Sequence, residues 1–288
     1  MPIPRDLKLQ IVSPAAEPPK GEDWLHEVKH DGHRLLAILD GGESLKLLSR
    51  NGRDRTALFC EPFRPFALAG LPPLVLDGEI AVPDERGVTH IDLLNEAISE
   101  RRPEQLAYFA FDLLFLDGED LRHRPLEDRK ALLRDVIGSA AGASPRIVAV
   151  DYVAGIGREL FEAIRQFGGE GIVSKRRGTL YRGGESRDWL KTKCHQTGTF
   201  VITGFSVLAS GRLEAVYVAE ERDGQLVPAG TVKVGLGKGL WVILDRLRDG
   251  PPSRKGFIPV RPELTAEVKY FGRIGRGFIR DGVLQTVR

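Results

Sequence analysis

The sequence predicts an α+β fold built in two parts. Strand-like and helix-like segments mix before Lys193 without a regular β-α-β alternation, which argues against a doubly wound parallel sheet. After Lys193 nearly all segments are short and strand-like. A hydrophobic content of 42% over 288 residues is sufficient for two separate cores.

The first part begins with a lead-in segment, residues 1–23, which is rich in proline and acidic residues. Runs typical of strands follow, separated by turn formers such as Asp31-Gly32 and Gly41-Gly42: Trp24–Lys29, Arg34–Leu39, Leu45–Ser49, Leu74–Val82 and Leu106–Leu116. Apolar residues recur at helical spacing in Glu127–Ile137 and Arg158–Phe167, and Gly168-Gly169 should end the second helix.

The second part has a different character. Its predicted strands are Phe200–Val207, Leu213–Glu220, Leu226–Val234, Ile258–Val260 and Ala266–Tyr270, with one helix at Leu240–Leu247. Asp223-Gly224 between two of the strands is a strong hairpin signal. Short strands with frequent turns favour a small barrel, for which an OB-fold is a natural candidate. We place the boundary near residues 194–199 and expect domains at 1–195 and 196–288.

Charge alone says little about partners, because the net charge is +2. Its distribution is more informative. Residues 175–193 hold seven Lys or Arg against two acids, and residues 254–288 hold eight against three. Such local basic surfaces suit a polyanionic partner, although ordinary solvated surface charge explains either cluster taken alone.

The cysteine count and the N-terminus indicate a reducing, non-membrane setting. Cys60 and Cys194 are the two cysteines, so we expect no disulfide framework. Cys194 and His195 are adjacent but have no second pair at zinc-ligand spacing, so we interpret both as structural. Neither a signal peptide nor an apolar run of 18 residues is present, which predicts a soluble protein of the cytoplasm with no membrane partner.

The segment with the clearest chemical content is Glu27-Val28-Lys29-His30-Asp31-Gly32-His33-Arg34. A nucleophilic lysine must be neutral, and burial or nearby positive charge lowers the pKa of its ammonium. Lys29 stands at the end of a predicted strand, Asp31-Gly32 permits a tight turn, and Arg34 offers a fork for a phosphate or sugar hydroxyl. An ordinary hairpin with exposed charges would have the same local sequence.

Four later segments add compatible chemistry: Leu76-Asp77-Gly78-Glu79, Phe111-Asp112, Glu170-Gly171-Ile172-Val173 and Trp189-Leu190-Lys191-Thr192-Lys193. Carboxylates in or beside apolar strands, as at Glu79 and Glu170, must be paired or bind a metal, and Mg²⁺ uses few carboxylates. Phe111 could stack on a base or belong to the core. Strand alternation puts Lys191 and Lys193 on one face, suited to a triphosphate or simply to solvent.

These segments, in this order, resemble the covalent nucleotidyltransferase superfamily, and within it the ATP-dependent DNA ligases. The greatest similarity is to the ligase domain of bacterial ligase D, the end-joining enzyme, and it extends from Trp24 to Arg288. The resemblance implies a mixed-sheet, ATP-grasp-like adenylation domain followed by an OB-fold barrel. It also implies ATP and Mg²⁺ or Mn²⁺ as cofactors.

The resemblance further implies roles for residues around the lysine. Lys29 would carry AMP covalently, Glu27 would lie at the adenine side of the pocket, and Phe111 would stack on adenine. Arg34 would contact the ribose or a phosphate. Arg50, in Ser49-Arg50-Asn51-Gly52, would contact a phosphate at the nick.

The remaining roles implied by the resemblance concern phosphate and metal. Glu79 would serve the nucleotide or the metal, and Glu170 would serve the metal. Lys191 and Lys193 would contact the α-phosphate, and Lys175 is a weaker candidate for phosphate contact.

The last residues depart from the family pattern. Residues 279–288 resemble the approach to the family motif Arg-x-Asp-Lys, with Arg288 as its arginine, but the sequence lacks the Asp and Lys. Because this motif orients the departing pyrophosphate in the family, we expect weakened self-adenylation. Joining of DNA that is already adenylated should suffer less.

The function expected from the sequence is therefore an ATP-dependent DNA ligase that seals nicks or broken duplex ends in the bacterial cytoplasm. End joining with a Ku-type partner and a monomeric state are part of this expectation. An RNA ligase or an mRNA capping guanylyltransferase would share the chemistry of Lys29. Two further hypotheses are a DNA-end binder that has lost turnover and a fragment of a larger repair enzyme.

Overall fold

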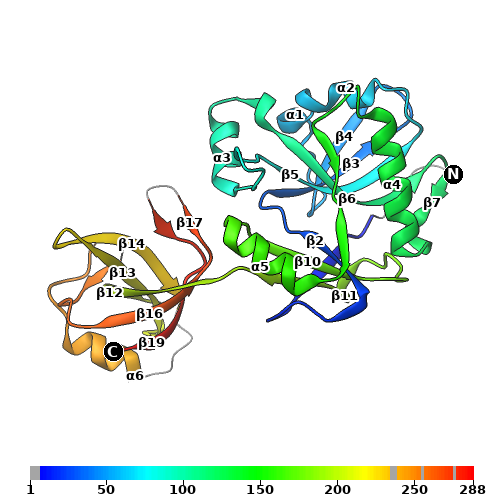
Figure 1. The fold of residues 1–288 in the computed structure, drawn as a ribbon. Coiled ribbons are helices and arrows are strands. Elements are labelled where there is room, and N and C mark those ends of the chain that lie inside the picture. The colour runs from blue at the N-terminus through cyan, green and yellow to red at the C-terminus, as the bar shows by residue number, and fades with distance from the viewer. Residues whose placement is uncertain (1–6, 234–238, 254–255, 275–276) are drawn as a thin grey trace. The chain divides into compact units, whose positions relative to one another are not determined.

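The computed structural model describes residues 7–233, 239–253, 256–274 and 277–288. The chain divides into two compact units, Met1–Cys194 and His195–Arg288, which we call unit 1 and unit 2 (Figure 1). Mixed sheets with few helices form unit 1, and unit 2 consists of strands with one helix in its described part. The expected mixed-sheet α+β class is thus confirmed at this level.

Two sheets form the frame of unit 1. Sheet A has the order β1-β11-β10-β2-β9, with β1 Gln10–Pro14, β11 Gly184–Lys193, β10 Gly171–Arg176, β2 Gly21–Val28 and β9 Tyr152–Gly155. Its β1–β11 pairing is parallel, and its other pairings are antiparallel. Sheet B has the order β4-β3-β5-β6-β7, with β4 Leu45–Ser49, β3 His33–Leu39, β5 Leu74–Ala81, β6 Ala107–Leu116 and β7 Glu119–Asp120. The short strand β8, Ile147–Ala149, pairs in parallel with β6.

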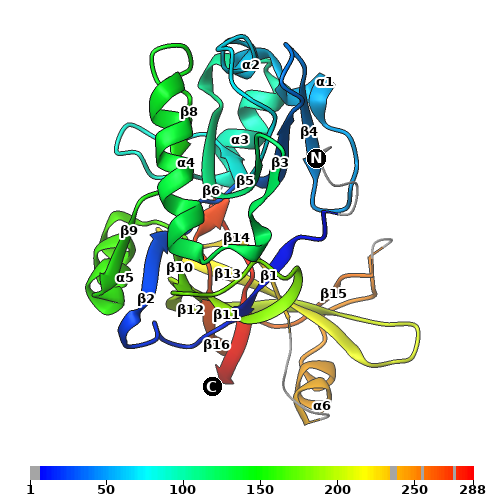
Figure 2. The ribbon, with the colours of Figure 1, turned by 90° about the vertical axis from the view of Figure 1, so that its right-hand side faces the viewer.

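The helices of unit 1 cover these sheets and connect their strands. The α-helices are α1 Thr56–Phe59, α2 Arg64–Ala67, α3 Ile91–Ser99, α4 Leu126–Ala140 and α5 Gly157–Phe167, and the 3₁₀ helices are η1 Glu61–Phe63, η2 Pro103–Gln105 and η3 Leu121–His123. Helix α4 packs on β6 and β8, whereas α5 packs on β2 and β10, as Figure 2 shows from the side. The largest core lies between sheet B and its helices and includes Leu35, Leu76, Tyr108 and Leu133.

The connection between β2 and β3 carries the chain from sheet A to sheet B, and Lys29 lies in it. Gly32 in this connection approaches β5 so closely that a Cβ would lie 2.0 Å from the carbonyl oxygen of Ile80. A side chain at this position therefore cannot be accommodated without moving the backbone. Close approach, rather than a special turn conformation, explains the glycine.

Asp31 and His30 fix the same connection from two sides. The backbone N–H of Asp31 donates to Thr89 Oγ1 at 2.9 Å, and its carboxylate accepts a hydrogen bond from the N–H of Ile91 at the start of α3. The ring of His30 stacks on Phe109 of β6, with ring centroids 3.8 Å apart. Lys29 is thus held on a connection whose neighbouring residues are anchored to sheet B.

A fully buried ion pair joins α4 to sheet B. Arg129 donates through Nε and NH2 to both carboxylate oxygens of Asp112 at 2.8 Å, and through NH1 to the carbonyl oxygens of Arg124 and Thr179. Both side chains of the pair are 0% exposed. Such a pair resists separation because removing one partner leaves an uncompensated charge inside the protein.

Unit 2 is a closed barrel. Its sheet has the order β13-β14-β19-β16-β12-β15, with β12 Gln196–Val207, β13 Leu213–Arg222, β14 Gln225–Lys233, β15 Ile258–Pro259, β16 Thr265–Tyr270 and β19 Val283–Val287. Because β12 also pairs with β13, the strands β12, β13, β14, β19 and β16 form a ring. Helix α6, Gly239–Arg246, lies between β14 and β15 in the chain, and β17 Arg273–Ile274 pairs with β18 Phe278–Ile279.

Most strands predicted from sequence are present within a few residues of their expected bounds, as are α4, α5 and α6. Gly168 ends α5 in the left-handed conformation, and Asp223 and Gly224 both have positive φ in the β13–β14 hairpin. Val234, the last residue of one predicted strand, lies outside the described residues.

The interpretation of residues 1–23 as a lead-in segment was wrong. Residues 10–14 form β1, which pairs with β11, and β2 already begins at Gly21. The prolines concealed this strand, because Pro14 is compatible with the end of an edge strand but not with a central one. Within the described ranges, no helix combines the length and the hydropathy needed to span a lipid bilayer.

We predict that Arg129→Met lowers the free energy of unfolding by about 3–5 kcal/mol, because it leaves Asp112 buried and unpaired. Urea unfolding of the purified protein measures this loss. Arg165→Met is the control: Arg165 forms an exposed ion pair with Glu162 on α5, and its loss should cost about 1 kcal/mol or less. Equal losses in the two variants would contradict the prediction.

A second prediction concerns acid stability. Burial lowers the pKa of His30 from its usual 6.5 to about 4, with Lys29 contributing in the same direction. Between these two values the unfolded chain binds a proton that the native protein does not, so stability falls as pH decreases from 6.5 to 4. His30→Phe should keep the stack on Phe109 and remove at most about 3 kcal/mol of this pH-dependent loss.

Unfolding free energies measured at several pH values, with the exposed His123→Gln as control, test this. A His30→Phe variant that loses stability with acid as steeply as the wild type would show that His30 is not responsible.

Candidate active site

The site residues predicted from sequence come together in one cavity of unit 1. This cavity has a volume of about 260 Å³, and we call it the lysine pocket. It is lined by all nine predicted residues, namely Glu27, Lys29, Arg34, Arg50, Glu79, Phe111, Glu170, Lys191 and Lys193. They come from both sheets of unit 1 and from the connections that flank their strands.

Lys29 forms an ion pair with Glu170. Its Nζ donates to Glu170 Oε2 at 2.5 Å, and Lys193 Nζ lies 3.2 Å from the other oxygen, Oε1. The Glu170 side chain is 3% exposed, whereas Lys29 is 21% exposed. One buried carboxylate thus holds the candidate nucleophile and a lysine of β11 together.

Lys191 adds a further positive charge to the same wall. Burial lowers its pKa, and the charges of Lys193 and Lys29 lower it further. Both β11 lysines line the pocket, in agreement with the prediction from strand alternation that they share a face. A wall of three lysines around one carboxylate suits a phosphate group.

Glu79, on β5, lines the lysine pocket together with the cations Lys29 and Arg34. Burial raises the pKa of its carboxyl to about 8, although the charges of Lys29 and Arg34 act in the opposite direction. Glu79 is therefore protonated more readily than an exposed carboxyl. A protonated carboxyl can donate a hydrogen bond as well as accept one, and it ionises readily if a cation binds nearby.

Arg34 is less free than the sequence suggested. It donates to both carboxylate oxygens of Asp77, at 2.9 and 2.6 Å, and to the carbonyl oxygen of Gln10. Burial alone would lower its pKa, but the charge and hydrogen bonds of Asp77 raise it overall. Tyr181 supports the pair, because its hydroxyl donates to Asp77 at 2.7 Å. The guanidinium of Arg34 is thus already hydrogen-bonded within the protein, although Arg34 still lines the lysine pocket.

Glu27 and Phe111 also line the pocket, and the guanidinium carbon of Arg34 lies 5.3 Å from the centroid of the Phe111 ring. Phe111 packs edge-on against Trp189, with centroids 6.1 Å apart. Lys175 Nζ donates to the Phe111 carbonyl oxygen at 2.9 Å and lies 2.8 Å from Glu27 Oε2. Burial lowers the pKa of Lys175 to about 8. Lys175 thus contacts Glu27 and also lines the lysine pocket, and its phosphate contact stays a prediction.

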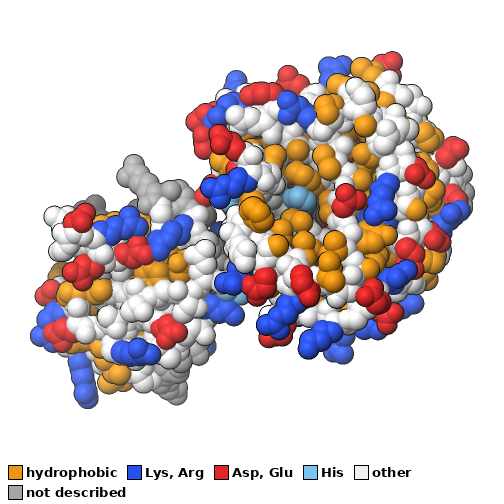
Figure 3. Space-filling model, viewed as in Figure 1, with side chains coloured by type: hydrophobic (Ala, Val, Ile, Leu, Met, Phe, Trp, Pro, Cys, Tyr) orange, Lys and Arg blue, Asp and Glu red, His pale blue; other side chains and the backbone are white. Residues whose placement is uncertain are grey.

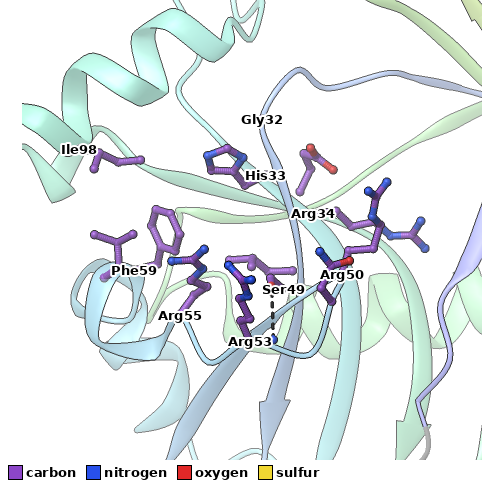
Figure 4. Close-up of a pocket in the computed structure, with 13 residues that line it drawn as sticks. Gly32, His33, Arg34, Ser49, Arg50, Arg53, Arg55, Phe59 and Ile98 are labelled. Carbon is purple, nitrogen blue, oxygen red and sulfur yellow. Dashed lines mark hydrogen bonds between the residues drawn. The ribbon is translucent and has the colours of Figure 1, made fainter.

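A second cavity adjoins the lysine pocket. It has a volume of about 460 Å³, and we call it the arginine pocket. The two cavities share Arg34, Arg50 and Glu79 in their linings. In Figure 4 the side chains of Arg53 and Arg55 extend into the arginine pocket. The apolar side chains of Phe59 and Ile98 line one end of it. The full lining is Gly32, His33, Arg34, Leu35, Ser49, Arg50, Asn51, Arg53, Arg55, Leu58, Phe59, Glu79 and Ile98.

The arginine pocket differs from the surrounding surface in the number of arginine side chains that line it. On the face of unit 1 seen in Figure 3, acidic and basic side chains are interspersed around the rim. Arg55 also acts on its neighbour His33, whose pKa is lowered first by burial and then by the Arg55 charge. The arginine pocket is therefore suited to an anionic group next to an apolar one.

Sequence reasoning missed several residues of this region. Arg53 and Arg55 follow the segment Ser49–Gly52 directly, and their charge was the available signal. Arg129 and Lys130 lie in a predicted helix whose buried residues include Leu126 and Leu133. A basic residue three or four positions from such leucines shares their face, which could have marked both as buried.

Arg288 is exposed, with its guanidinium 3.8 Å from Glu267.

The donor set for a metal ion consists of Glu79 and Glu170. Among the described residues, no group of three or more His, Cys, Asp or Glu is placed to hold a metal. Two carboxylates nevertheless fit Mg²⁺, which commonly keeps several waters and takes phosphate oxygens as further ligands. A site with only oxygen donors beside three lysines suits a metal–phosphate complex better than a bare ion.

Comparison with known proteins gives the family. Residues 9–193 match the ATP dependent DNA ligase domain. The multifunctional non-homologous end joining protein LigD of Pseudomonas aeruginosa is 33% identical over 306 residues, covering 100% of this chain and 36% of that protein. The bifunctional LigD of Bacillus subtilis is 30% identical over 295 residues, covering 92% and 46%. The chain thus spans less than half the length of these relatives.

Solved structures agree. A structure of mycobacterial DNA ligase D complexed with ATP and MES is 31% identical with a TM-score of 0.58, covering 98% of this chain and 95% of that one. The ligase domain of Mycobacterium tuberculosis LigD is 30% identical with a TM-score of 0.58, covering 97% and 93%. With the lysine pocket and the matched domain in agreement, this chain belongs to the ATP-dependent DNA ligase family.

Proposed function

We propose that this chain seals nicks or broken ends in duplex DNA through AMP carried covalently on Lys29. The observation that carries the proposal is the lysine pocket, where Lys29 lies beside Glu170, Lys191 and Lys193 in a chain of the DNA ligase family. The roles of individual residues given below are part of the proposal.

In the first step the neutral Nζ of Lys29 attacks the α-phosphorus of ATP. A nitrogen–phosphorus bond forms, the bond from phosphorus to the bridging oxygen breaks, and pyrophosphate leaves with the electron pair. Nζ must lose its proton before it can attack. Lys191 and Lys193 line the same pocket and stabilise the negative charge that gathers at phosphorus.

In the second step an oxygen of the 5′-phosphate at the break attacks the AMP phosphorus, and Lys29 leaves and regains a proton. In the third step the 3′-hydroxyl loses its proton and attacks the activated 5′-phosphate, and AMP departs. The arginine pocket is the candidate position for this DNA end, because it adjoins the lysine pocket and presents Arg50, Arg53 and Arg55.

Glu79 and Glu170 would hold Mg²⁺ or Mn²⁺ in the lysine pocket. A divalent ion bound there would neutralise charge on the phosphate oxygens during transfer. The remaining roles belong to the protein: Glu27 and Phe111 take the adenine end, and Arg34 keeps a fixed cation near the ribose. Arg34 can keep this position because Asp77 holds its guanidinium.

We further propose that unit 1 is the adenylation domain and that unit 2 is an OB-fold. The support for the second assignment is the ring β12-β13-β14-β19-β16, which is the five-stranded closed arrangement typical of that fold. Backbone contacts should dominate DNA binding by the whole chain, so affinity should fall with salt and vary little with base sequence.

The cellular setting is proposed from the relatives alone. Their names describe non-homologous end joining, and the chain covers 36% and 46% of two of them. Repair of double-strand breaks together with a Ku-type end-binding protein, by a monomeric ligase unit, is the setting that follows from this resemblance.

We predict that wild-type protein incubated with α-labelled ATP and Mg²⁺ forms a covalent adduct, seen as label at 31.8 kDa after denaturation. Lys29→Ala should abolish this label, because no amine remains to attack phosphorus. Lys29→Arg is the matched variant: it retains a charge opposite Glu170 but offers no nucleophile at neutral pH. Persistent label in either variant would refute Lys29 as the site.

The same assay separates DNA ligase activity from related chemistry. Label from GTP instead of ATP would indicate a capping-type enzyme, and sealing of nicked RNA but not DNA would indicate an RNA ligase. A wild type that forms no adduct yet seals pre-adenylated nicks would locate the defect in the first step alone.

We also predict that Arg53→Ala and Arg55→Ala weaken nick sealing without affecting adduct formation, because both residues line the arginine pocket and neither lines the lysine pocket. Each substitution should reduce the salt dependence of DNA affinity, with the log–log slope changing by about 1 per lost phosphate contact. Fluorescence anisotropy with a nicked duplex measures this. Unchanged binding, matching that of the exposed-arginine variant Arg165→Ala, would exclude the arginine pocket as a DNA site.

A further inference from the structure

The buried carboxylate of Glu27 is held from two directions. Glu27 is the penultimate residue of β2 and is 2% exposed, yet it lines the lysine pocket. Lys175 Nζ, from β10, lies 2.8 Å from Oε2. Lys130 Nζ, from α4, lies 2.8 Å from Oε1. Each oxygen of this carboxylate therefore has its own ammonium partner.

The two lysines differ in their relation to the pocket. Lys175 lines it, and its ammonium lies 4.2 Å from the centroid of the Trp189 ring. Lys130 does not line it and is 1% exposed, with its Nζ also donating to the carbonyl oxygen of Val150 at 2.5 Å. Lys130 thus contacts Glu27 from within the protein core rather than from the lysine pocket.

Two buried ammonium groups around one carboxylate exceed what charge neutrality requires. Taking each such charge out of water costs several kcal/mol, so the arrangement is not the most stable way to fill this space. It does restrict the orientation of the Glu27 carboxylate, through an ammonium contact on each oxygen. An ionised carboxylate can only accept hydrogen bonds.

We propose that Lys130 is a positioning residue for nucleotide selection, which holds Glu27 as an oriented acceptor for the amino group of adenine. The inference rests on the proposed function, in which the base lies between Glu27 and Phe111. Adenine presents an amino donor where guanine presents a carbonyl oxygen. A carboxylate acceptor attracts the first and repels the second, and without Lys130 only the contact with Lys175 restrains its orientation.

The test compares adduct formation from labelled ATP and labelled GTP over a range of nucleotide concentrations. In Lys130→Met the ATP concentration for half-maximal rate should rise about tenfold or more, as expected for loss of one charge-assisted contact. The ratio of ATP to GTP efficiency should fall by a similar factor. The maximal rate with ATP should stay close to that of the wild type, because Lys29 and its partners are untouched.

Two further variants and one activity serve as controls. Lys130→Arg, which keeps a cation behind Glu27, should recover most of the ATP preference. Arg134→Met removes a basic residue one turn later on α4, which contacts Tyr152 and Asp151 near the surface, and it should change neither quantity. A pre-adenylated nick brings its adenine already attached to DNA, so at saturating DNA the maximal rate of its sealing should stay close to that of the wild type in Lys130→Met and reports that the protein is folded.

Each outcome decides the matter. An unchanged ATP dependence and ATP-to-GTP ratio in folded Lys130→Met overturn the proposal, as does a loss of maximal rate and of nick sealing without loss of selectivity. If Lys130→Met does not fold, Lys130→Gln retains a hydrogen-bonding group without the charge and must show the same loss of selectivity. A wild type that forms no adduct with either nucleotide and does not seal pre-adenylated nicks refutes the proposed function itself.

Discussion

The ion pair between Lys29 and Glu170 is the interaction on which the lysine pocket depends. Glu170 is buried before β10, and a buried carboxylate must be compensated. Its two oxygens receive Lys29, on the connection from sheet A to sheet B, and Lys193, on β11. The same contacts that satisfy the carboxylate therefore bring Lys29, the proposed nucleophile, and Lys193, a proposed phosphate contact, to one place.

Other buried carboxylates of unit 1 are compensated by cations in the same way. Asp77 holds Arg34, Asp112 holds Arg129, and Glu27 lies between Lys130 and Lys175. Apolar side chains of similar volume would often stabilise a core equally well or better than such pairs. Their value is geometric, because each pair aligns a charged group of one element with a partner from another. The pocket is thereby organised before any nucleotide arrives.

The sequence predicted the charged residues of the lysine pocket, because they belong to short local patterns such as Lys29 to Gly32 or Trp189 to Lys193, but it missed Ile11 and Val12 of β1, which also line the pocket. It could not reveal contacts between distant segments. The contact of Arg34 with Asp77 depends on the pairing of β3 with β5, and the contact of Glu27 with Lys130 depends on the packing of α4. Strand β1 was missed for a related reason, since its stability comes from β11, far along the chain.

The sharing of residues between the two cavities gives the order of chemistry a structural basis. Glu79 and Arg50 line both the lysine pocket and the arginine pocket. Burial raises the pKa of the Glu79 carboxyl to about 8, so a nearby cation can change its charge without movement of β5. In the proposed function these two shared residues would face a phosphate that is first part of ATP and then part of the DNA end.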